Sequence, residues 1–280
     1  MSSILTNNGA MVALQTLKSI NTDLNKAQSE ISTGKSISNA KDNAAIWAIS
    51  KVMETDQAAF KTMQSGLNVA EATVATARTG AEQVTDLLKE MKNLALNAGT
   101  DGFDYDKVQT DITAKMAQIT SIVSGTQMNG VNLLSTNGVD GGATFTVLAS
   151  LDRQVGAAAT TPGTIAVASV DFEANIVGGT LTAITDRASA QTAVGDLEAL
   201  IEVAVNGAAA LGSSGKRIAD QANFVGKLAD SLDSGIGSLV DADMEEASAR
   251  LQALQTQQQL GIQALSIANQ APSSIMALFR

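Results

Sequence analysis

Two stretches of the chain carry residue types that do chemistry in other proteins, and the first is rich in glycine. Residues 212–216 read GSSGK, and a lysine after such glycines is typical of loops that bind phosphate through backbone N–H groups. The pattern fails because Ala210 stands where a glycine is required, and Arg217 stands where Ser or Thr would hold magnesium. The stretch also lies inside a heptad pattern rather than after a strand. We therefore predict no nucleotide site here.

The second stretch is acidic and reads DADMEE over residues 241–246. Clustered carboxylates bind hard cations, but this run lacks the alternating ligands and the glycine of a calcium loop. Helix capping explains it better, with Asp241 or Asp243 as the N-cap. Glu245 and Glu246 would then lie in the first turn, where the helix dipole favours anions. We interpret the run as the start of the last helix.

The composition excludes the commonest kinds of catalytic and metal-binding site. The 280-residue chain has no His and no Cys, so it lacks the usual general base, the thiolate nucleophile and the commonest zinc ligands. Its single Trp47 and single Tyr105 are expected to pack in the core, because no basic residues interleave with further aromatic ones. We predict no catalytic residue, no cofactor and no metal, and we do not expect an enzyme.

Charge and hydropathy argue against two further kinds of partner. The net charge is −10 and no basic stripe occurs, so we expect no nucleic-acid binding. No run approaches the ~18 apolar residues that span a bilayer, so we expect no membrane span. The N-terminus lacks the features of a cleaved secretory signal. This predicts a chain that is cytoplasmic, or exported without signal cleavage.

The elements that would position any such residues are long helices. From Met53 to Ala98, apolar residues recur at heptad spacing and include Leu67, Val74 and Leu88. A helix over this stretch is about 70 Å long, whereas globular helices average ~11–12 residues.

A second seam runs over residues 190–239 and includes Leu211, Ile218 and Val225. These three residues and the three of the first seam are called the rod seam below. A shorter amphipathic helix is predicted over residues 105–123. We therefore expect a mainly α fold, a long antiparallel helical bundle or coiled coil with paired terminal helices.

The N-terminal end is amphipathic as well. Leu17, Leu24 and Ile31 recur at heptad spacing, and Gly34 is placed to end that helix. Its apolar stripe is narrow, and only the other end of the chain offers an intramolecular partner. Because a lone pair of such helices is marginal in water, we infer that the ends become ordered when copies of the chain assemble.

The C-terminal end carries the matching stripe. It begins with Met244, Ala247, Leu251 and Leu254. It is predicted to shift across three glutamines, residues 257–259, to Leu260, Ala264, Ile267 and Ala271. Such a shift resembles a stutter in a coiled coil.

The middle of the chain, residues 135–189, differs in composition and is rich in Gly and Thr. Thr144–Leu148 is a candidate strand, and apolar and polar residues alternate over 170–176, which predicts a second one. Pro162-Gly163 is interpreted as a turn. We expect a small insertion that contains a β-hairpin.

Four stretches of this sequence resemble one family, bacterial flagellin. They are residues 31–45 (ISTGKSISNAKDNAA), 127–131 (QMNGV), 241–243 (DAD) and 268–280 (ANQAPSSIMALFR). The similar regions cover about 1–134 and 190–280, with a divergent middle.

The resemblance implies a structural role in a flagellar filament that serves swimming motility. Residues 1–34 and 244–280 would form the filament core, 44–134 and 190–240 a helical rod, and 135–189 a variable, outward-facing part. The core-packing residues would be Leu17, Leu24, Ile31, Leu251, Leu254, Leu260, Ile267 and Leu278.

The resemblance also implies partners and a location. The main partner would be the chain itself, in a helical homopolymer outside the cell. Secretion through the flagellar export channel would involve a chaperone at the C-terminal segment, and growth would involve the cap and junction proteins. The absence of cysteine suits a chain that is threaded unfolded.

One departure from the family concerns the Toll-like flagellin receptor. Relatives that it senses present an Arg four residues before a Leu and a Glu just before that Leu. With Leu94 as the anchor, those positions are Glu90 and Asn93 here. Because mismatched charges weaken an interface, we expect weak receptor activation. The alternative is that Glu90 is simply a solvated surface residue.

Two other functions compete with the filament subunit. A hook–filament junction protein of the flagellum shares terminal helices but matches the quoted stretches less well. A cytoplasmic coiled-coil scaffold would form a rod without the QMNGV turn.

Overall fold

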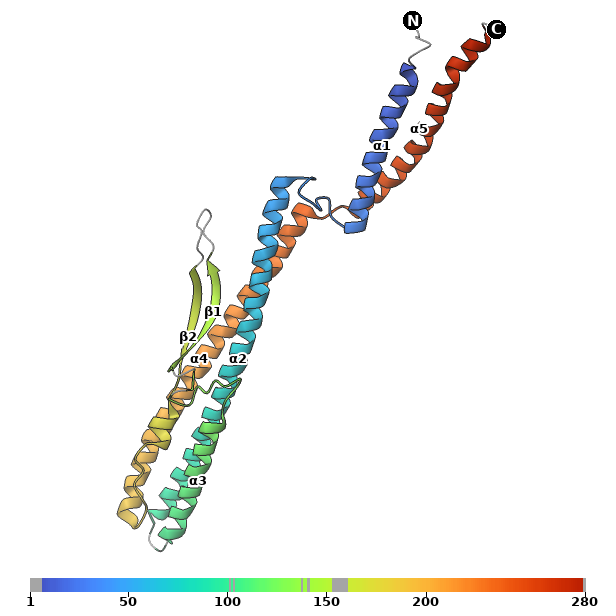
Figure 1. Ribbon diagram of the computed structural model, residues 1–280. Helices are drawn as coiled ribbons and strands as arrows, with labels where there is room; N and C mark the ends of the chain where they lie inside the picture. The colour runs from blue at the N-terminus through green and yellow to red at the C-terminus, as the bar shows by residue number, and fades with distance from the viewer. Residues whose placement is uncertain are drawn as a thin grey trace. The chain divides into compact units, whose positions relative to one another are not determined.

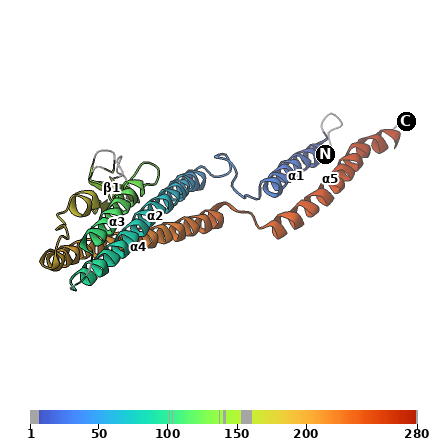
Figure 2. The same ribbon diagram turned by 90° about the horizontal axis from the view of Figure 1, so that it is seen from below.

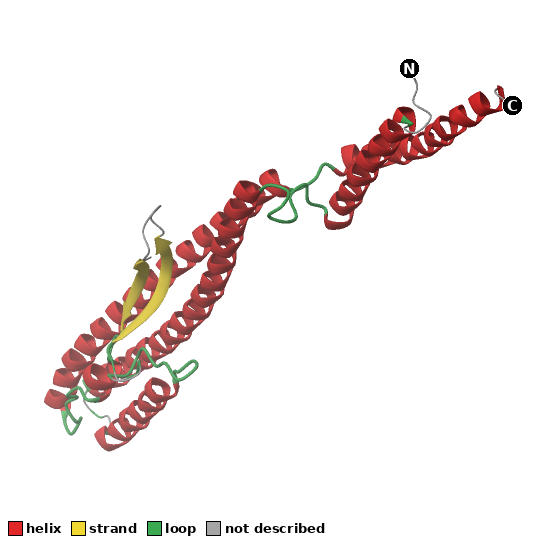
Figure 3. Cartoon of the chain, turned by 45° about the horizontal axis from the view of Figure 1, so that its top comes forward, coloured by secondary structure: helices red, strands yellow, loops and turns green. Residues whose placement is uncertain are grey.

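The computed structural model describes residues 7–278 apart from 101, 103, 137, 140, 141 and 153–160, and it describes no side chain for 152, 161 or 271–278. The described elements are, in order, α1 (Asn8–Thr33), α2 (Ala44–Ala98), α3 (Tyr105–Gly125), β1 (Thr144–Asp152), β2 (Thr161–Ala168), the short π-helix η1 (Glu173–Val177), α4 (Arg187–Val240) and α5 (Met244–Leu278), as Figure 3 shows. The expected mainly α fold with a small hairpin is confirmed.

The chain divides into two compact units, residues 1–57 with 230–280 and residues 58–229. In the second unit α2 and α4 run antiparallel. Lys92 Nζ lies 2.7 Å from Glu198 Oε1 near one end of the pair, and Gly226 lies beside Gln64 near the other. The six rod-seam residues are at most 1% exposed: Leu67, Val74, Leu88, Leu211, Ile218 and Val225. Burying side chains of this size contributes about 1.5–3 kcal/mol each.

Helix α3 packs on the same core. It begins at Tyr105 as predicted and ends two residues later than expected. Asp104 caps it by accepting a 3.3 Å hydrogen bond from the N–H of Lys107. Four residues on one face are buried, namely Val108, Ile112, Ile119 and Val123. Their spacing is that of a helix with a single apolar stripe.

Strands β1 and β2 form an antiparallel hairpin (Figure 1). The register shifts between Leu148 and Ser150, which marks a bulge. At the bulge the carbonyl of Ala149 accepts a 2.5 Å hydrogen bond from Nε2 of Gln221 on α4. This bond attaches the hairpin to the helical core.

The interpretation of Pro162-Gly163 as a turn is wrong, because both residues lie near the start of β2. Proline is tolerated near the beginning of an edge strand, where its missing N–H breaks no ladder. Gly163 pairs with Ser150 at the bulge, where an added Cβ would meet the Ser150 hydroxyl.

The predicted strand over residues 170–176 is also wrong, since this stretch holds η1. Phe172 and Ile176 are both fully buried, whereas Ala174 between them is exposed. A strand would place all three residues on one face, so this burial pattern fits a helical turn. Asp171 takes a φ of +44° and accepts a 3.1 Å hydrogen bond from the N–H of Ala174, which starts the turn. The ring of Phe172 fits against α4 at Gly207.

Candidate functional site

The terminal helices α1 and α5 begin and end at residues with the expected capping chemistry. The side chain of Asn7 accepts a 3.1 Å hydrogen bond from the N–H of Ala10 at the start of α1. Gly34 ends α1 with a φ of +70°, a conformation that glycine adopts without strain, and its N–H donates to the Glu30 carbonyl at 2.9 Å. The prediction for Gly34 is confirmed.

The acidic run 241–246 caps α5, as its interpretation required. Oδ1 of Asp243 accepts from the N–H groups of Glu245 and Glu246, at 3.0 and 3.2 Å. Asp241 has another role, because its backbone forms an isolated antiparallel bridge with Lys35. Of the two N-cap candidates, the structure therefore selects Asp243.

Helices α1 and α5 lie side by side, as both Figure 1 and Figure 2 show. Within the side chains that the structure describes, their shared core is small. It consists of Leu24, Ala27 and Leu254, with Ile20 and Leu251 partly buried against them. So few buried side chains leave such a pair only marginally stable in water by itself.

The stutter predicted across residues 257–259 is wrong. The inner face of α5 continues at regular heptad spacing through Leu254, half-buried Gln258 and Gly261, which approaches Leu17 of α1. Leu260 and Ile267 point elsewhere and are 58% and 69% exposed. The sequence pattern followed large apolar residues only, whereas the face that packs against α1 also includes Gln258 and Gly261.

Large apolar side chains remain exposed on both terminal helices. Among the described side chains they are Met11, Val12 and Leu14 on α1, and Met244, Leu260, Ile262 and Ile267 on α5. Of the predicted core-packing residues, Leu24 and Leu254 are buried, while Leu17, Ile31 and Leu251 are half-buried. The side chain of Leu278 lies outside the described residues. Sequence reasoning missed Met11, Val12, Leu14 and Ile262, although their large apolar side chains on amphipathic helices were a usable signal.

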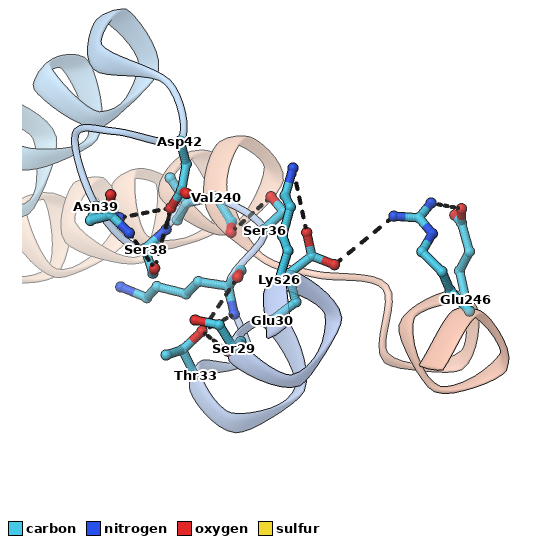
Figure 4. Close-up of polar contacts among 12 residues, drawn as sticks. Lys26, Ser29, Glu30, Thr33, Ser36, Ser38, Asn39, Asp42, Val240 and Glu246 are labelled. Carbon is cyan, nitrogen blue, oxygen red and sulfur yellow. Dashed lines mark hydrogen bonds and ion pairs between the residues drawn. The ribbon is translucent and has the colours of Figure 1, made fainter. Parts of the chain in front are cut away.

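A charged cluster lies at the lower end of this helix pair, near the linkers. Glu30 is 9% exposed, with Nζ of Lys26 3.9 Å away and Nη1 of Arg250 4.0 Å away. Arg250 also pairs with Glu246 at 2.6 Å (Figure 4). Asp23 lines the same hollow of about 290 Å³. The cluster links α1 to α5 through the ion pair between Glu30 and Arg250, whose charged atoms lie 4.0 Å apart.

Residues 34–37, which follow α1, are joined by backbone hydrogen bonds to residues 240–242, where α4 ends and the linker to α5 begins. We call these two segments the linker clamp. The carbonyl of Val240 accepts from the N–H groups of Ser36 and Ile37, at 2.7 and 3.4 Å. The N–H of Ala242 donates to the carbonyl of Gly34 at 2.9 Å. The linker that leaves α1 is thus held against the linker that enters α5.

The loop that follows the clamp is ordered by one carboxylate (Figure 4). Oδ2 of Asp42 accepts from the N–H groups of Asn39 and Ser38, at 3.1 and 3.0 Å, and from the Ser38 hydroxyl at 3.3 Å. These hydrogen bonds, that of the Asn39 N–H first, hold the pKa of the Asp42 carboxyl below its usual value. A charged Asp42 therefore favours this loop conformation.

Nearby, two lysines surround Glu54 near the start of α2. Nζ of Lys51 lies 2.6 Å from Oε2, and Nζ of Lys35 lies 3.4 Å from Oε1. The hydrogen bond from Lys51 is the main reason why the pKa of Glu54 lies below its usual value. Lys35 thus connects the linker clamp to α2.

The positions predicted to meet the Toll-like flagellin receptor lie on α2 in the other unit. Glu90 is exposed and its Oε2 lies 2.5 Å from Nζ of Lys115 on α3. Asn93 is exposed and Leu94 is half-buried. The structure therefore brings Glu90 and Lys115 together, which the sequence did not predict.

The stretches that the sequence analysis considered for ligand binding belong to helices and helix caps. The GSSGK stretch lies inside α4, and Lys216 makes an i,i+4 contact of 3.8 Å with Asp220. Across the described side chains, no three acidic residues are grouped so that they could hold a metal ion. None of the helices, searched over their described residues, is both long and apolar enough to span a bilayer.

Comparisons with known proteins match both helical ends. Residues 4–138 match the model of the bacterial flagellin N-terminal helical region, and residues 192–279 match that of the C-terminal helical region. The chain is 39% identical over 284 residues to flagellin FljM of Caulobacter vibrioides, an alignment that covers 100% of this chain and 99% of the relative. It is 38% identical over 285 residues to a flagellin of Brucella melitensis, with 100% of both chains covered. The similarity thus includes the segment between the helical ends.

Proposed function

This chain belongs to the bacterial flagellin family and is a structural subunit of the flagellar filament, and we propose that it polymerises by packing its terminal helices against those of neighbouring copies. In this proposal α1 and α5 form the filament core, and the subunit works by packing alone, without catalysis. The flagellin family is a family of structural proteins.

The observation that carries the proposal is the set of exposed apolar side chains on the terminal helices. Among the described side chains, three large apolar residues on α1 and four on α5 remain exposed beside a small α1–α5 core. Burying each of them against a neighbour would contribute about 1.5–3 kcal/mol. Assembly therefore supplies the stability that the isolated helix pair lacks, which couples ordering of the ends to polymerisation.

The proposed mode of association is heterologous. A face on one copy that packs against a different face on the next copy makes a heterologous contact, and such contacts generate a helical polymer when they do not close into a ring. The predicted core residues, from Leu17 to Leu278, would then be buried between copies. The rod segments 44–134 and 190–240 would surround the core, and residues 135–189 would face outwards.

We place the polymer outside the cell, after export of the unfolded chain. The absence of cysteine supports this route, because no disulfide can obstruct threading. Exposed Leu260, Ile262 and Ile267 give an export chaperone an apolar segment to cover on α5. The cap and junction proteins would meet the same helix ends during growth.

Weak activation of the Toll-like flagellin receptor is a separate part of the proposal. Glu90 presents a carboxylate where sensed relatives have a guanidinium, and Lys115 holds that carboxylate at 2.5 Å. The double variant Glu90→Arg with Asn93→Glu should raise receptor signalling by purified monomer, whereas Glu82→Arg, an exposed change on the same helix, should not. Strong signalling by the unmodified chain would contradict this part.

The test of polymerisation is seeded regrowth. Filaments are dissociated by heat, mixed with short seeds, and examined by electron microscopy. Chains that lack residues 1–31 or 250–280 should stay soluble and add nothing to the seeds. Filaments built from either truncated chain would overturn the proposal.

Point variants sharpen this test. Leu14→Glu places a charge on the exposed apolar face of α1 and should abolish regrowth, since a buried unpaired carboxylate is strongly unfavourable. Gln15→Glu adds the same charge at an exposed polar neighbour and should leave regrowth within a few-fold of the unmodified chain. Equal regrowth of the two variants would show that the apolar face does not drive assembly.

A further inference from the structure

The apolar pattern of the terminal helices does not select one alignment of α1 against α5. On α1, Leu17, Leu24 and Ile31 repeat at heptad spacing. On α5, Leu254 and Gly261 belong to a series of apolar or small residues with the same spacing. Sliding one helix by a heptad, about 10 Å, again places apolar residues opposite apolar ones. Something other than hydrophobic matching must distinguish these alignments.

One residue on the inner face of α5 breaks the apolar pattern. Leu251, Gln258 and Leu265 form one heptad series, and all three are half-buried against α1. Nε2 of Gln258 donates a 2.6 Å hydrogen bond to Oδ1 of Asn21, which is itself half-buried. The polar member of the series therefore meets a polar partner in this alignment.

A heptad slip destroys that match. It brings Leu251 or Leu265 opposite Asn21 and moves Gln258 about 10 Å away from its partner. Both amides then lose their hydrogen bond in a partly desolvated interface. In coiled coils a single buried polar residue specifies the alignment of the helices in the same way, at some loss of stability.

We propose that the Asn21–Gln258 hydrogen bond specifies the register of the terminal helix pair. Contacts near the two ends of the pair support the same alignment: Asn7 Nδ2 donates to the Ala268 carbonyl at 2.7 Å, and Arg250 approaches Glu30. One register brings the exposed apolar residues of α1 and α5 to the same relative level in every subunit. That consequence for the filament rests on the proposed function, whereas the register itself does not.

The absence of cysteine makes the register directly measurable. Leu17→Cys with Gly261→Cys reports the native register, because an added Cβ at residue 261 would lie 3.2 Å from the Leu17 side chain. Leu17→Cys with Leu254→Cys reports the slipped register, because a disulfide needs Cα atoms roughly 4.4–6.8 Å apart and the native offset is one heptad. Each pair is oxidised in the full chain under polymerising conditions, and intrachain disulfide is quantified by electrophoretic mobility.

Both cysteine pairs are introduced into three further variants, and the ratio of slipped to native disulfide is compared with that of the same pairs in the otherwise unmodified chain. Asn21→Leu with Gln258→Leu removes the hydrogen bond and should raise the ratio of slipped to native disulfide at least tenfold. Asn25→Leu with Gln255→Leu makes the same changes at exposed positions and should leave the ratio unchanged. Asn21→Gln with Gln258→Asn exchanges the two amides and should restore the native ratio.

An unchanged ratio in the Asn21→Leu, Gln258→Leu background would overturn the proposal, as would equal yields of both disulfides in the unmodified background. Filament regrowth is scored separately on the same samples. Loss of regrowth with a native disulfide ratio would count against the assembly mechanism and not against the register pair.

Discussion

The backbone N–H of Ser36 donates a 2.7 Å hydrogen bond to the carbonyl oxygen of Val240, the last residue of α4. The Ser36 hydroxyl donates to the same oxygen at 3.2 Å. The last four carbonyl groups of a helix accept no hydrogen bond from within that helix. Their donors must therefore come from elsewhere in the chain or from water. Here the partner comes from the linker after α1, more than two hundred residues earlier in the chain.

We expect Ser36→Pro to loosen the linker clamp far more than Ser36→Ala. Proline removes the N–H donor and restricts the preceding Lys35, which should lower the free energy of unfolding by about 1–3 kcal/mol. Alanine removes only the hydroxyl and should lower it by about 0.5–1.5 kcal/mol. Urea unfolding measures both changes, and hydrogen exchange at the Ala242 amide reports the reciprocal bond. Equal effects of the two variants would show that the N–H of Ser36 is dispensable.

Acid should release the loop at Asp42. The pKa of this carboxyl is lowered in the folded chain, chiefly by the hydrogen bond from the Asn39 N–H, so the charged form stabilises the loop. That stabilisation is fully present above the carboxyl's ordinary value of 3.8 and is lost as the pH falls through the lower, folded-state pKa. The protection of the Ser38 and Asn39 amides from hydrogen exchange, relative to the intrinsic rate at each pH, should therefore fall in acid. In Asp42→Asn this acid-dependent loss of protection should be absent; if it persists there, another group is responsible.

Two glycine-to-alanine changes in α4 should have opposite signs. At Gly195 an added Cβ meets nothing within 4 Å, so Gly195→Ala should stabilise the helix by about 0.5–1 kcal/mol. At Gly207 the Cβ would lie 2.5 Å from Cε1 of Phe172, so Gly207→Ala should destabilise by about 1–3 kcal/mol despite the same gain in helix propensity. Thermal melting of the monomer by circular dichroism gives both signs. Stabilisation by Gly207→Ala would mean that Phe172 is free to move aside.

Removing the Gln221 side chain should weaken the attachment of the hairpin. Gln221→Ala leaves the carbonyl of Ala149, a buried residue, without its 2.5 Å partner, which should lower the free energy of unfolding by about 1–3 kcal/mol. Asn223→Ala, at an exposed position on the same helix, should change it by less than about 0.5 kcal/mol. Urea unfolding and exchange of the β1 amides measure the effect. Similar values for both variants would show that the hairpin is held by apolar packing alone.

The heptads of the long helices and the caps at Gly34 and Asp243 were predictable because they depend on neighbours a few residues away. The strand β2 and the π-helix η1 were not. Pro162-Gly163 has the composition of a turn, and residues 170–176 alternate like a strand. Short segments of this kind take the conformation that their tertiary partners require, here Ser150 opposite Gly163 and the α4 surface under Phe172.

The inner face of α5 shows the same limit within a strongly periodic helix. The sequence places Leu260 and Ile267 on an apolar stripe, and their predicted burial between copies of the chain stays a prediction. Which side of α5 meets α1 within one chain depends on the shape of the partner, and α1 packs against Gly261 and Gln258 instead.

By itself, the sequence determined that the chain forms long antiparallel helices with amphipathic ends, because helix periodicity and capping are local properties of side chains. The tertiary structure alone decided that Val240 meets Ser36, that Gln221 meets Ala149, and that Glu90 meets Lys115. Two of these three contacts use backbone carbonyl groups, which every residue carries and no sequence pattern marks. The third joins exposed charges on different helices, whose meeting depends on how α2 and α3 pack.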